Sequence, residues 1–245
     1  MWYYKTTKDD TEVIEKLLEM SELKPNRGVD YYYHRIRKQG YLWNRKRVLR
    51  VYRLMGLSLT SKRKKKRLPA RVKTPLKQPE APCQVWSADF MSDSLVTGRP
   101  FRIFNMIDDY NRQALCTEAN FSMPAIRVVS YIKQAIEVYG KPLEIRVDNG
   151  PEFLSNLFVK FCDTEGININ YTEPGEPTQN GYVERFNKTF REDVLDAYIF
   201  SNIEQARYLA EDFREDYNEY HPHKSLARKS PNEVLREFTK GLAPL

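Results

Sequence analysis

The segment RVDNGPEF, Arg146–Phe153, decides the fold, because it is compatible with two different structures. Leu143, Ile145 and Val147 alternate as in a strand, and Asn-Gly after a strand is the strongest short-range signal for a β-hairpin. After Pro151, however, apolar residues follow the helical spacing i, i+3, i+4, i+7, at Leu154, Leu157, Phe158 and Phe161. We therefore predict a strand-to-helix crossover with Asp148 at the end of the strand, where α/β proteins place ligand sites.

The sequence around this crossover predicts an α/β fold with one mixed five-stranded sheet in a domain spanning residues 84–245. Before the crossover strand, three strands with short connections form an antiparallel meander. After the crossover helix, a short fifth strand is expected over residues 169–172. The order β-β-β-α-β-α-β-α-α places helices on both faces of the sheet. Apart from the crossover helix, the helices of this domain are expected at 124–140, 178–196 and 203–220.

The charge is distributed unevenly along the chain. Residues 1–80 contain 22 Lys or Arg against 8 Asp or Glu, a net charge of +14, whereas residues 81–245 carry −7. A basic part joined to an acidic part predicts a module that binds a polyanion. A solvated basic surface without a partner is the alternative.

The first 60 residues predict a small all-helical domain of the helix-turn-helix kind. Helices are expected over 11–23 and 28–39, and a third between Asn44, a good N-cap, and Gly56, a good stop. Basic residues at i, i+4, i+7 share one face of the third helix, and we predict that this face binds DNA. These residues are Lys46, Arg50 and Arg53. An ordinary helical hairpin with a charged outside is the alternative.

Residues 61–83 predict a basic, proline-rich linker. The segment begins with six consecutive basic residues, Lys62–Arg67, and continues with four prolines, so it cannot build a core. DNA would neutralise the repulsion between these charges, and we predict contacts from Lys64, Lys65 and Lys66. A solvated tether is the alternative.

Two further acidic residues occupy unusual positions. Asp89 lies inside an otherwise apolar strand, where a carboxylate is costly unless it is paired, hydrogen-bonded or metal-bound. Glu184 lies on the helix predicted over 178–196 and shares a face with Lys188 and Arg191. Between Asp89 and Asp148 there are 58 residues, and between Asp148 and Glu184 there are 35.

Other polar residues have simpler structural interpretations. Asp108 and Asp109 are expected in a tight turn, and Asp93 in a solvated loop. Glu152 is expected in the first turn of a helix, where it suits the helix dipole. Other side chains are expected to be loop, structural or core residues: Glu173, Glu176, His221, His223 and Trp86.

Four short motifs resemble the DDE transposases and retroviral-type integrases, and in particular bacterial insertion-sequence transposases of the OrfB type. The motifs are WSADFMSD (86–93), VDNGPEF (147–153), PTQNGYVERFN (177–187) and YNEYHPHKSL (217–226). The spacing of Asp148 and Glu184 and the basic Arg191 add to the resemblance, which covers nearly the whole chain. It implies that the catalytic core has an RNase H-like fold.

The resemblance also implies a metal site. Asp89, Asp148 and Glu184 would be the catalytic and metal-binding residues, with Asp89 bridging two Mg²⁺ ions and the others each holding one. Hard cations of this kind prefer oxygen ligands, and Mn²⁺ is expected to substitute for Mg²⁺. Lys188 and Arg191 would lie beside the DNA phosphates. Asn149 is expected to orient Asp148 or to support the crossover.

The function implied is cleavage and strand transfer of DNA during transposition of an insertion sequence. The expected partners are DNA (the terminal inverted repeats and the target), further copies of the chain on that DNA, and an upstream-frame (OrfA-type) partner or fusion. The expected location is the bacterial cytoplasm, in association with the nucleoid. A membrane protein is not expected, because no run of 18 apolar residues occurs, and three scattered cysteines argue against a zinc or disulfide framework.

Two other functions are compatible with the same residues. One is a non-catalytic DNA-binding regulator derived from a transposase, although an intact acidic triad argues against such decay. The other is an RNase H-type nuclease, although cleavage of RNA–DNA hybrids needs no separate basic module.

Overall fold

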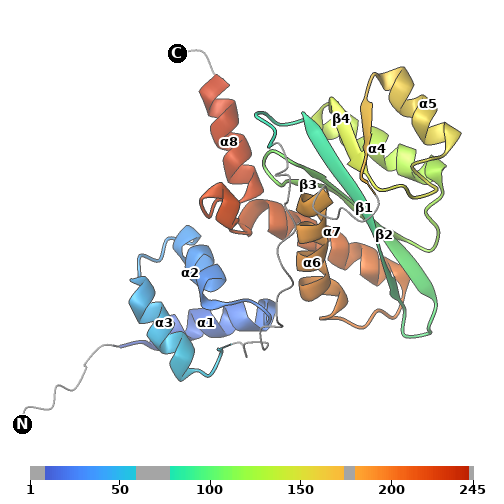
Figure 1. Ribbon diagram of the computed structural model, residues 1–245. Helices are drawn as coiled ribbons and strands as arrows, with labels where there is room; N and C mark the ends of the chain where they lie inside the picture. The colour runs from blue at the N-terminus through green and yellow to red at the C-terminus, as the bar shows by residue number, and fades with distance from the viewer. Residues whose placement is uncertain (1–8, 59–77, 174–179, 243–245) are drawn as a thin grey trace, which may run out of the picture. The chain divides into compact units, whose positions relative to one another are not determined.

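The computed structural model describes residues 9–58, 78–173 and 180–242 (Figure 1). The contacts divide the chain into two compact units, residues 1–68 and residues 69–245. Within the described residues, no helix is both long enough and apolar enough to cross a membrane.

The first unit is a three-helix cluster. It consists of α1 (Thr11–Leu23), α2 (Val29–Lys38) and α3 (Arg45–Leu54), close to the predicted bounds. Asn44 caps α3 as predicted, because its side chain accepts a hydrogen bond from the backbone N–H of Lys46. All three helices contribute to one small core, in which Leu17, Tyr32 and Val48 are fully or almost fully buried.

The second unit contains the predicted mixed five-stranded sheet. Its spatial order is β3-β2-β1-β4-β5, with β1, β2 and β3 antiparallel and β4 and β5 parallel to β1. The strands are β1 (Val85–Ser94), β2 (Pro100–Asp108), β3 (Ala114–Asn120), β4 (Glu144–Val147) and β5 (Asn168–Tyr171).

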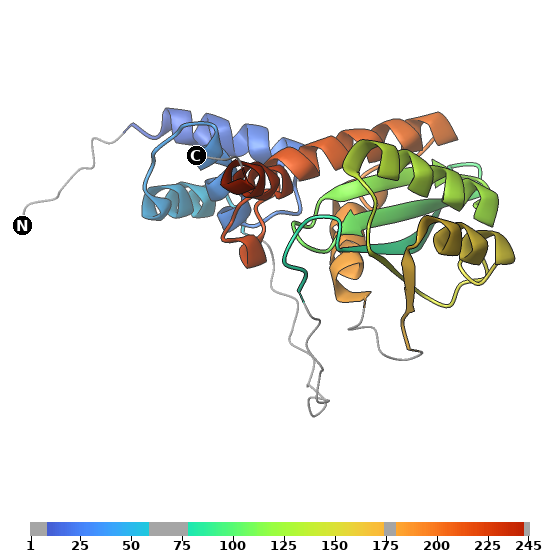
Figure 2. The same ribbon diagram turned by 90° about the horizontal axis from the view of Figure 1, so that it is seen from above.

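Helices cover both faces of this sheet (Figures 1 and 2). Helices α4 (Ala125–Tyr139) and α5 (Asn156–Glu165) build one core, against the face of β1 that carries Trp86 and Ala88. Helices α6 (Gly181–Phe190) and α7 (Ile203–Tyr220) build the other, against the face that carries Met91. Because side chains alternate along a strand, Asp89 belongs to the α6 face.

The crossover segment folds as a strand-to-helix connection, as predicted, but its helix starts later than the apolar spacing suggests. Ser155 is the N-cap of α5 and accepts a hydrogen bond from the N–H of Phe158 at 3.2 Å. Leu154 precedes the helix and is 54% exposed, and Leu157 is 46% exposed. Phe158 carries the packing together with Phe161.

The C-terminal part differs from the prediction in two places. The helix expected over 178–196 is an α-helix only from Gly181 to Phe190; a π-helix, η2 (Arg191–Leu195), continues it. The start of that expectation, residues 178 and 179, lies outside the described residues. A short 3-10 helix, η3 (Lys224–Leu226), and α8 (Pro231–Leu242) follow α7 and were not predicted.

Candidate active site

Asp89 and Asp148 lie at the same level of neighbouring parallel strands. The pairing of β1 with β4 covers Val85↔Glu144 to Ser87↔Arg146, and each aspartate lies two residues beyond that last pair. Asp148 is the first residue after β4 rather than its last. The observed register therefore brings these two acidic residues to the same level of neighbouring strands.

Asp89 is held by side-chain amides. Nδ2 of Asn187, on α6, donates to Oδ2 of Asp89 at 2.7 Å. Asn105, which lies opposite Asp89 on β2, donates from Nδ2 to Oδ1 of Asn187, also at 2.7 Å. The two amides thus form a chain from the central sheet through the helix to the carboxylate.

Burial raises the pKa of Asp89 to about 6, and the negative charges of Asp148 and Glu184 add to the rise. The charges of Asp148 and Glu184 therefore both reach Asp89, although the three residues come from three separate elements. The neutral amide of Asn187 orients Asp89 without cancelling its charge. This concentration of negative charge favours a cation.

Asp148 is exposed, and a hydrogen bond within its own loop orients its carboxylate. Its Oδ1 accepts a hydrogen bond from the N–H of Gly150 at 3.1 Å. A Cβ at residue 150 would come within 2.9 Å of this oxygen, so glycine permits the close approach. Asn149 donates from Nδ2 to the carbonyl of Thr172 at 2.9 Å. Of its two expected roles, this contact supports the structural one, because it ties the crossover to the end of β5.

Glu184 lies in the first turn of α6 with an exposed side chain, and desolvation of its carboxylate by nearby protein atoms raises its pKa. Two contacts hold the start of this helix. Asn180 donates to the carbonyl of Ala88 at 3.3 Å, and the guanidinium of Arg112 lies 3.5 Å from the centroid of the Tyr182 ring. The first of these contacts ties the Glu184 helix to β1, next to Asp89.

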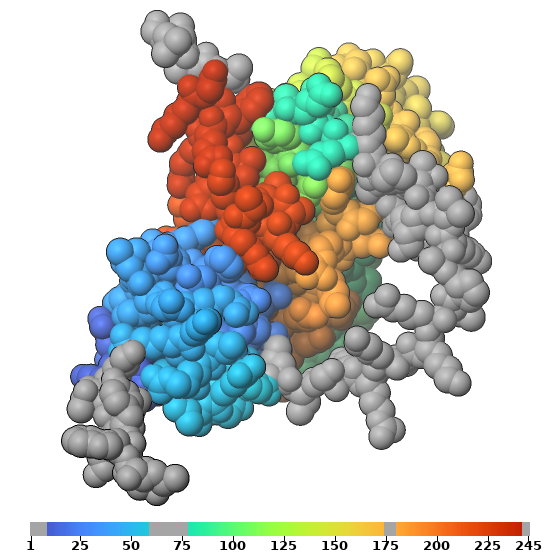
Figure 3. Space-filling model, turned by 60° about the vertical axis from the view of Figure 1, so that its left-hand side comes forward, coloured from blue at the N-terminus to red at the C-terminus, as the bar shows by residue number. Residues whose placement is uncertain are grey.

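The basic residues expected beside the metal lie along the same segment, part of which is visible at the surface in orange in Figure 3. Lys188 is exposed and lies 3.8 Å from Glu192. Arg191 donates to the carbonyl of Ser92 at 3.3 Å. Arg191 is the C-cap of α6, with α-helical dihedral angles and its N–H bonded to the carbonyl of Asn187, so it continues the helical spacing of Glu184 and Lys188.

The donor set fits a hard divalent cation. Carboxylate oxygens from Asp89, Asp148 and Glu184 are the ligands that Mg²⁺ prefers. In the described residues, no three His, Cys, Asp or Glu side chains already stand in a metal-binding arrangement. The fit therefore rests on donor chemistry and on the mutual repulsion felt at Asp89.

Sequence reasoning missed Asn105 and Asn187. Asn187 lies three residues after Glu184, so a helical projection would have placed it on the same face. Asn105 is a polar residue inside the apolar strand β2 and is fully buried. The argument that singled out Asp89 in β1 would have identified it as well.

The two acidic residues expected in a tight turn do lie at the end of β2 and in the turn after it, but both are buried. Asp108 accepts hydrogen bonds from the N–H groups of Cys83 and Tyr110, at 2.7 and 2.8 Å, so the expected local bonding is only part of its role. Asp109 forms an ion pair with Arg146 at 2.7 Å, with side chains 0% and 8% exposed. Both residues support the fold.

Two other sequence interpretations have different outcomes. Glu152 was expected in the first turn of a helix, but it precedes α5 and pairs with Arg102 on β2. His221 and His223 pack on the Tyr217 ring, with centroids 4.8 and 5.1 Å away, in agreement with a structural role.

In the first unit, the predicted DNA-binding side chains lie together. Lys46, Arg50 and Arg53 line a shallow hollow of about 460 Å³ on α3 with Leu49 and Leu54. Arg50 also pairs with Asp10 at 2.5 Å. Lys64, Lys65 and Lys66 lie outside the described residues.

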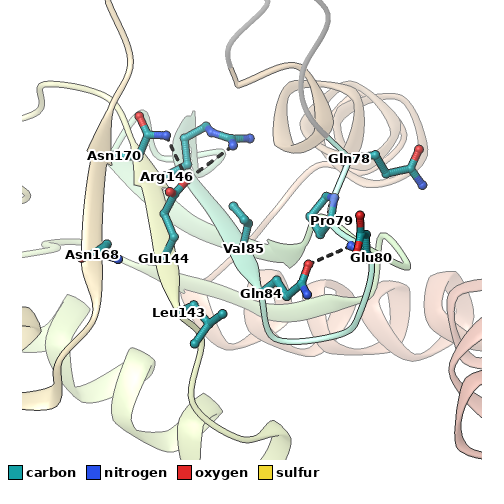
Figure 4. A pocket seen from close by; sticks show the side chains of 10 residues that line it. All are labelled: Gln78, Pro79, Glu80, Gln84, Val85, Leu143, Glu144, Arg146, Asn168 and Asn170. Atoms are coloured by element: carbon teal, nitrogen blue, oxygen red, sulfur yellow. Dashed lines mark hydrogen bonds and ion pairs between the residues drawn. The ribbon is translucent and has the colours of Figure 1, made fainter.

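A polar pocket of about 440 Å³ lies near the start of β1 and β4 and contains none of the predicted site residues (Figure 4). Its polar groups largely bond to one another. Asn170 donates to Glu144 at 2.9 Å, and the Gln84 side chain accepts from the N–H of Glu80 at 2.7 Å. This pocket is therefore separate from the acidic site.

Comparison with known proteins assigns the family. Two family models, each described as an integrase core domain, match residues 79–177 and 165–231. A 31.7 kDa protein of insertion element IS407 from Burkholderia multivorans is 31% identical over 218 residues, covering 89% of this chain and 78% of the relative. Transposase InsD for insertion element IS2 from Escherichia coli is 29% identical over 245 residues, covering 94% and 80%.

Among solved structures, the simian T-cell lymphotropic virus intasome in complex with the PP2A regulatory subunit B56 gamma matches with a TM-score of 0.55. The identity is 17%, over 90% of this chain and 73% of that chain, so this likeness concerns the fold alone. It confirms the predicted RNase H-like core. Together with the sequence relatives, it shows that the chain belongs to the DDE transposase and integrase superfamily, as an insertion-sequence transposase with an integrase core domain.

Proposed function

We propose that this transposase cleaves DNA and transfers the cut strand through a metal site built from Asp89, Asp148 and Glu184. The observation that carries the proposal is the state of Asp89. It is partly buried and hydrogen-bonded to an amide, and its pKa is raised by burial and by the charges of the two other acids. A bound cation would offset the cost of keeping this carboxylate ionised.

The chain's own residues would have separate tasks. Asp89, Asp148 and Glu184 would together hold two Mg²⁺ ions, for which Mn²⁺ would substitute. When bound, the ions supply charge neutralisation at the phosphate and an activated attacking oxygen. Asn187 would keep Oδ2 of Asp89 oriented, while Lys188 and Arg191 would contact the DNA phosphates.

The three-helix unit would bind DNA in the manner of a helix-turn-helix domain. The exposed basic side chains on α3 support this role, because phosphate contacts from Lys and Arg dominate DNA affinity. Lys64, Lys65 and Lys66 would add to the same contact, in a linker between a domain of residues 1–60 and the core of residues 84–245.

Transposition itself implies the remaining partners. Joining two ends of an element to a target requires at least two copies of the chain on DNA that contains the terminal inverted repeats. An upstream-frame (OrfA-type) partner or fusion would supply recognition of the ends, and the protein would act at the bacterial nucleoid.

The test is a strand-cleavage assay on DNA that carries the terminal repeats. The purified chain is incubated with Mg²⁺, with Mn²⁺ or with EDTA, and the D89N variant is the matched control. We expect nicks with new 3′-hydroxyl ends and joined products with either metal, and neither product with EDTA. Protection of the repeats without nicking would favour the DNA-binding regulator instead. Cleavage of an RNA–DNA hybrid without joining would favour the nuclease.

A further inference from the structure

Hydrogen bonding between strands does not fix the separation of Asp89 and Asp148. The pairing of β1 with β4 ends at Ser87↔Arg146, two residues before either aspartate. Beyond this point β1 continues along β2, whereas the chain after Val147 turns into a loop over residues 148–155. Other contacts must therefore hold this loop against β1.

Most polar contacts of the loop lead away from β1. Asn149 bonds to the carbonyl of Thr172, and the Tyr171 hydroxyl donates to the carbonyl of Phe153 at 2.9 Å, both toward the β5 edge. Throughout the described ranges, the ion pair of Glu152 with Arg102 is the one polar contact from β1, β2 or β3 to this loop. It reaches from β2 across β1.

The same pair is supported by stacked aromatic rings. The guanidinium of Arg102 lies 4.2 Å from the centroid of the Phe90 ring, and the Phe90 and Phe153 rings stack at 5.2 Å. The Arg102 side chain is 35% exposed and that of Glu152 is 12% exposed, so water screens this pair less than a pair on the open surface. Phe90 points to the opposite face of β1 from Asp89, so these contacts of Arg102 do not involve the hydrogen bond between Asn187 and Asp89.

Glu152 also lies close to Asp148. A single point, the position of a Cβ on Gly150, is 2.9 Å from Oδ1 of Asp148 and 3.3 Å from Oε2 of Glu152. The two oxygens are therefore no more than about 6 Å apart, a distance at which unscreened like charges repel appreciably. Arg102 offsets this repulsion as well as holding the loop.

We propose that Arg102 and Glu152 are positioning residues that clamp the Asp148 loop to β1 and thereby set the separation of Asp89 and Asp148 required by the metal. The proposal rests on the metal-dependent function proposed above. The direction of the change in metal affinity distinguishes this role from a simple charge effect. Replacing Arg102 by Glu adds negative charge near a cation site, which by charge alone would tighten metal binding, whereas opening the clamp weakens it.

The experiment measures Mn²⁺ binding to the full chain by calorimetric titration without DNA. The variants are R102E, E152R and the charge swap R102E/E152R, and unfolding temperatures establish that each is folded. R236E is the matched control, because Arg236 pairs with Glu219 at 2.6 Å outside the site. We expect R102E and E152R to bind Mn²⁺ about 10-fold more weakly, the charge swap to bind it more tightly than either single variant, and R236E to match the parent.

A second readout needs no metal. Hydrogen exchange of the Phe153 and Leu154 amides, which both donate to the carbonyl of Gly150 at 3.0 Å, reports opening of the loop. We expect faster exchange in R102E and parental exchange in the charge swap. The positioning role would be overturned if R102E bound Mn²⁺ as tightly as the parent or more tightly. It would also be overturned if the charge-swap variant bound Mn²⁺ no more tightly than R102E. If the parent binds no Mn²⁺, the metal-dependent function fails, and the exchange data still decide whether the pair holds the loop.

Discussion

Asn187 donates a 2.7 Å hydrogen bond to Asp89, so the helix that carries Glu184 is bonded directly to the strand that carries Asp89. Asn105 completes the link by donating to Asn187 from β2. Two acidic residues that are far apart in the sequence are thereby held by one buried chain of amides. The proposed site consequently depends on neutral residues as much as on acids.

Asn187 offers a direct test of this chain. We expect N187L to raise the Mg²⁺ concentration for half-maximal cleavage about 10-fold, because it removes the donor that orients Asp89 without changing the charge. N168A, at an exposed amide on β5, is the control. An unchanged Mg²⁺ dependence in N187L would mean that this amide serves packing only.

The acidic residues themselves should be individually essential. We expect D89N, D148N and E184Q each to reduce cleavage to the level seen without protein, because each removes a charged oxygen ligand. Gel-shift affinity for the same DNA should be retained, since phosphate contacts come from basic residues. D93N, just beyond the site on β1, should keep its activity. Full activity in any of the three variants removes that residue from the site.

The buried Asp109–Arg146 pair predicts an effect on stability. D109N should lower the free energy of unfolding by about 3 kcal/mol, because it leaves the buried Arg146 guanidinium with only the longer, more exposed pair to Glu144 at 3.5 Å. The double variant D109L/R146M should be more stable than D109N, since no uncompensated charge remains. Urea denaturation measures both. A double variant less stable than D109N would contradict this account of the pair.

The basic face of α3 predicts a salt effect. K46A and R53A should each reduce the slope of log affinity against log salt by about 1, as expected when one phosphate contact is lost. R50A should change the slope less, because Asp10 already neutralises Arg50. Filter binding at several salt concentrations gives these slopes. Slopes equal to the parental slope in all three variants would mean that α3 does not contact DNA.

The order of helices and strands could be predicted from the sequence, because the two-residue apolar spacing of a strand differs clearly from the 3.6-residue spacing of a helix. Alternation identified the strands, and the 3.6-residue spacing after Pro151 distinguished a crossover from a hairpin. The same spacing gave the wrong start for α5, because Leu154 fits the period by chance while the Ser155 cap sets the boundary. Apolar spacing also cannot detect the one extra residue that turns the end of α6 into a π-helix.

The site was predictable only in part. Asp89 stood out because a carboxylate inside an apolar strand requires compensation. Its compensation comes from Asn187, which is 98 residues away, and through it from Asn105, so no local pattern shows either contact. For the same reason, the partner of Glu152 could not be read from the residues next to it, since Arg102 lies 50 residues earlier.

The π-helix η2 separates two structural requirements within one continuous helical segment. Ahead of it, α6 aligns Glu184 and Asn187 with the sheet; within it, Val194 and Leu195 enter the core shared with α7. A π-helical turn accommodates one additional residue, which rotates whatever follows by about 100°. Deleting a residue from 191–195 would restore a single helical phase and force the two alignments to compete. The extra residue therefore lets Val194 and Leu195 reach the α7 core while Glu184 keeps its orientation toward β1.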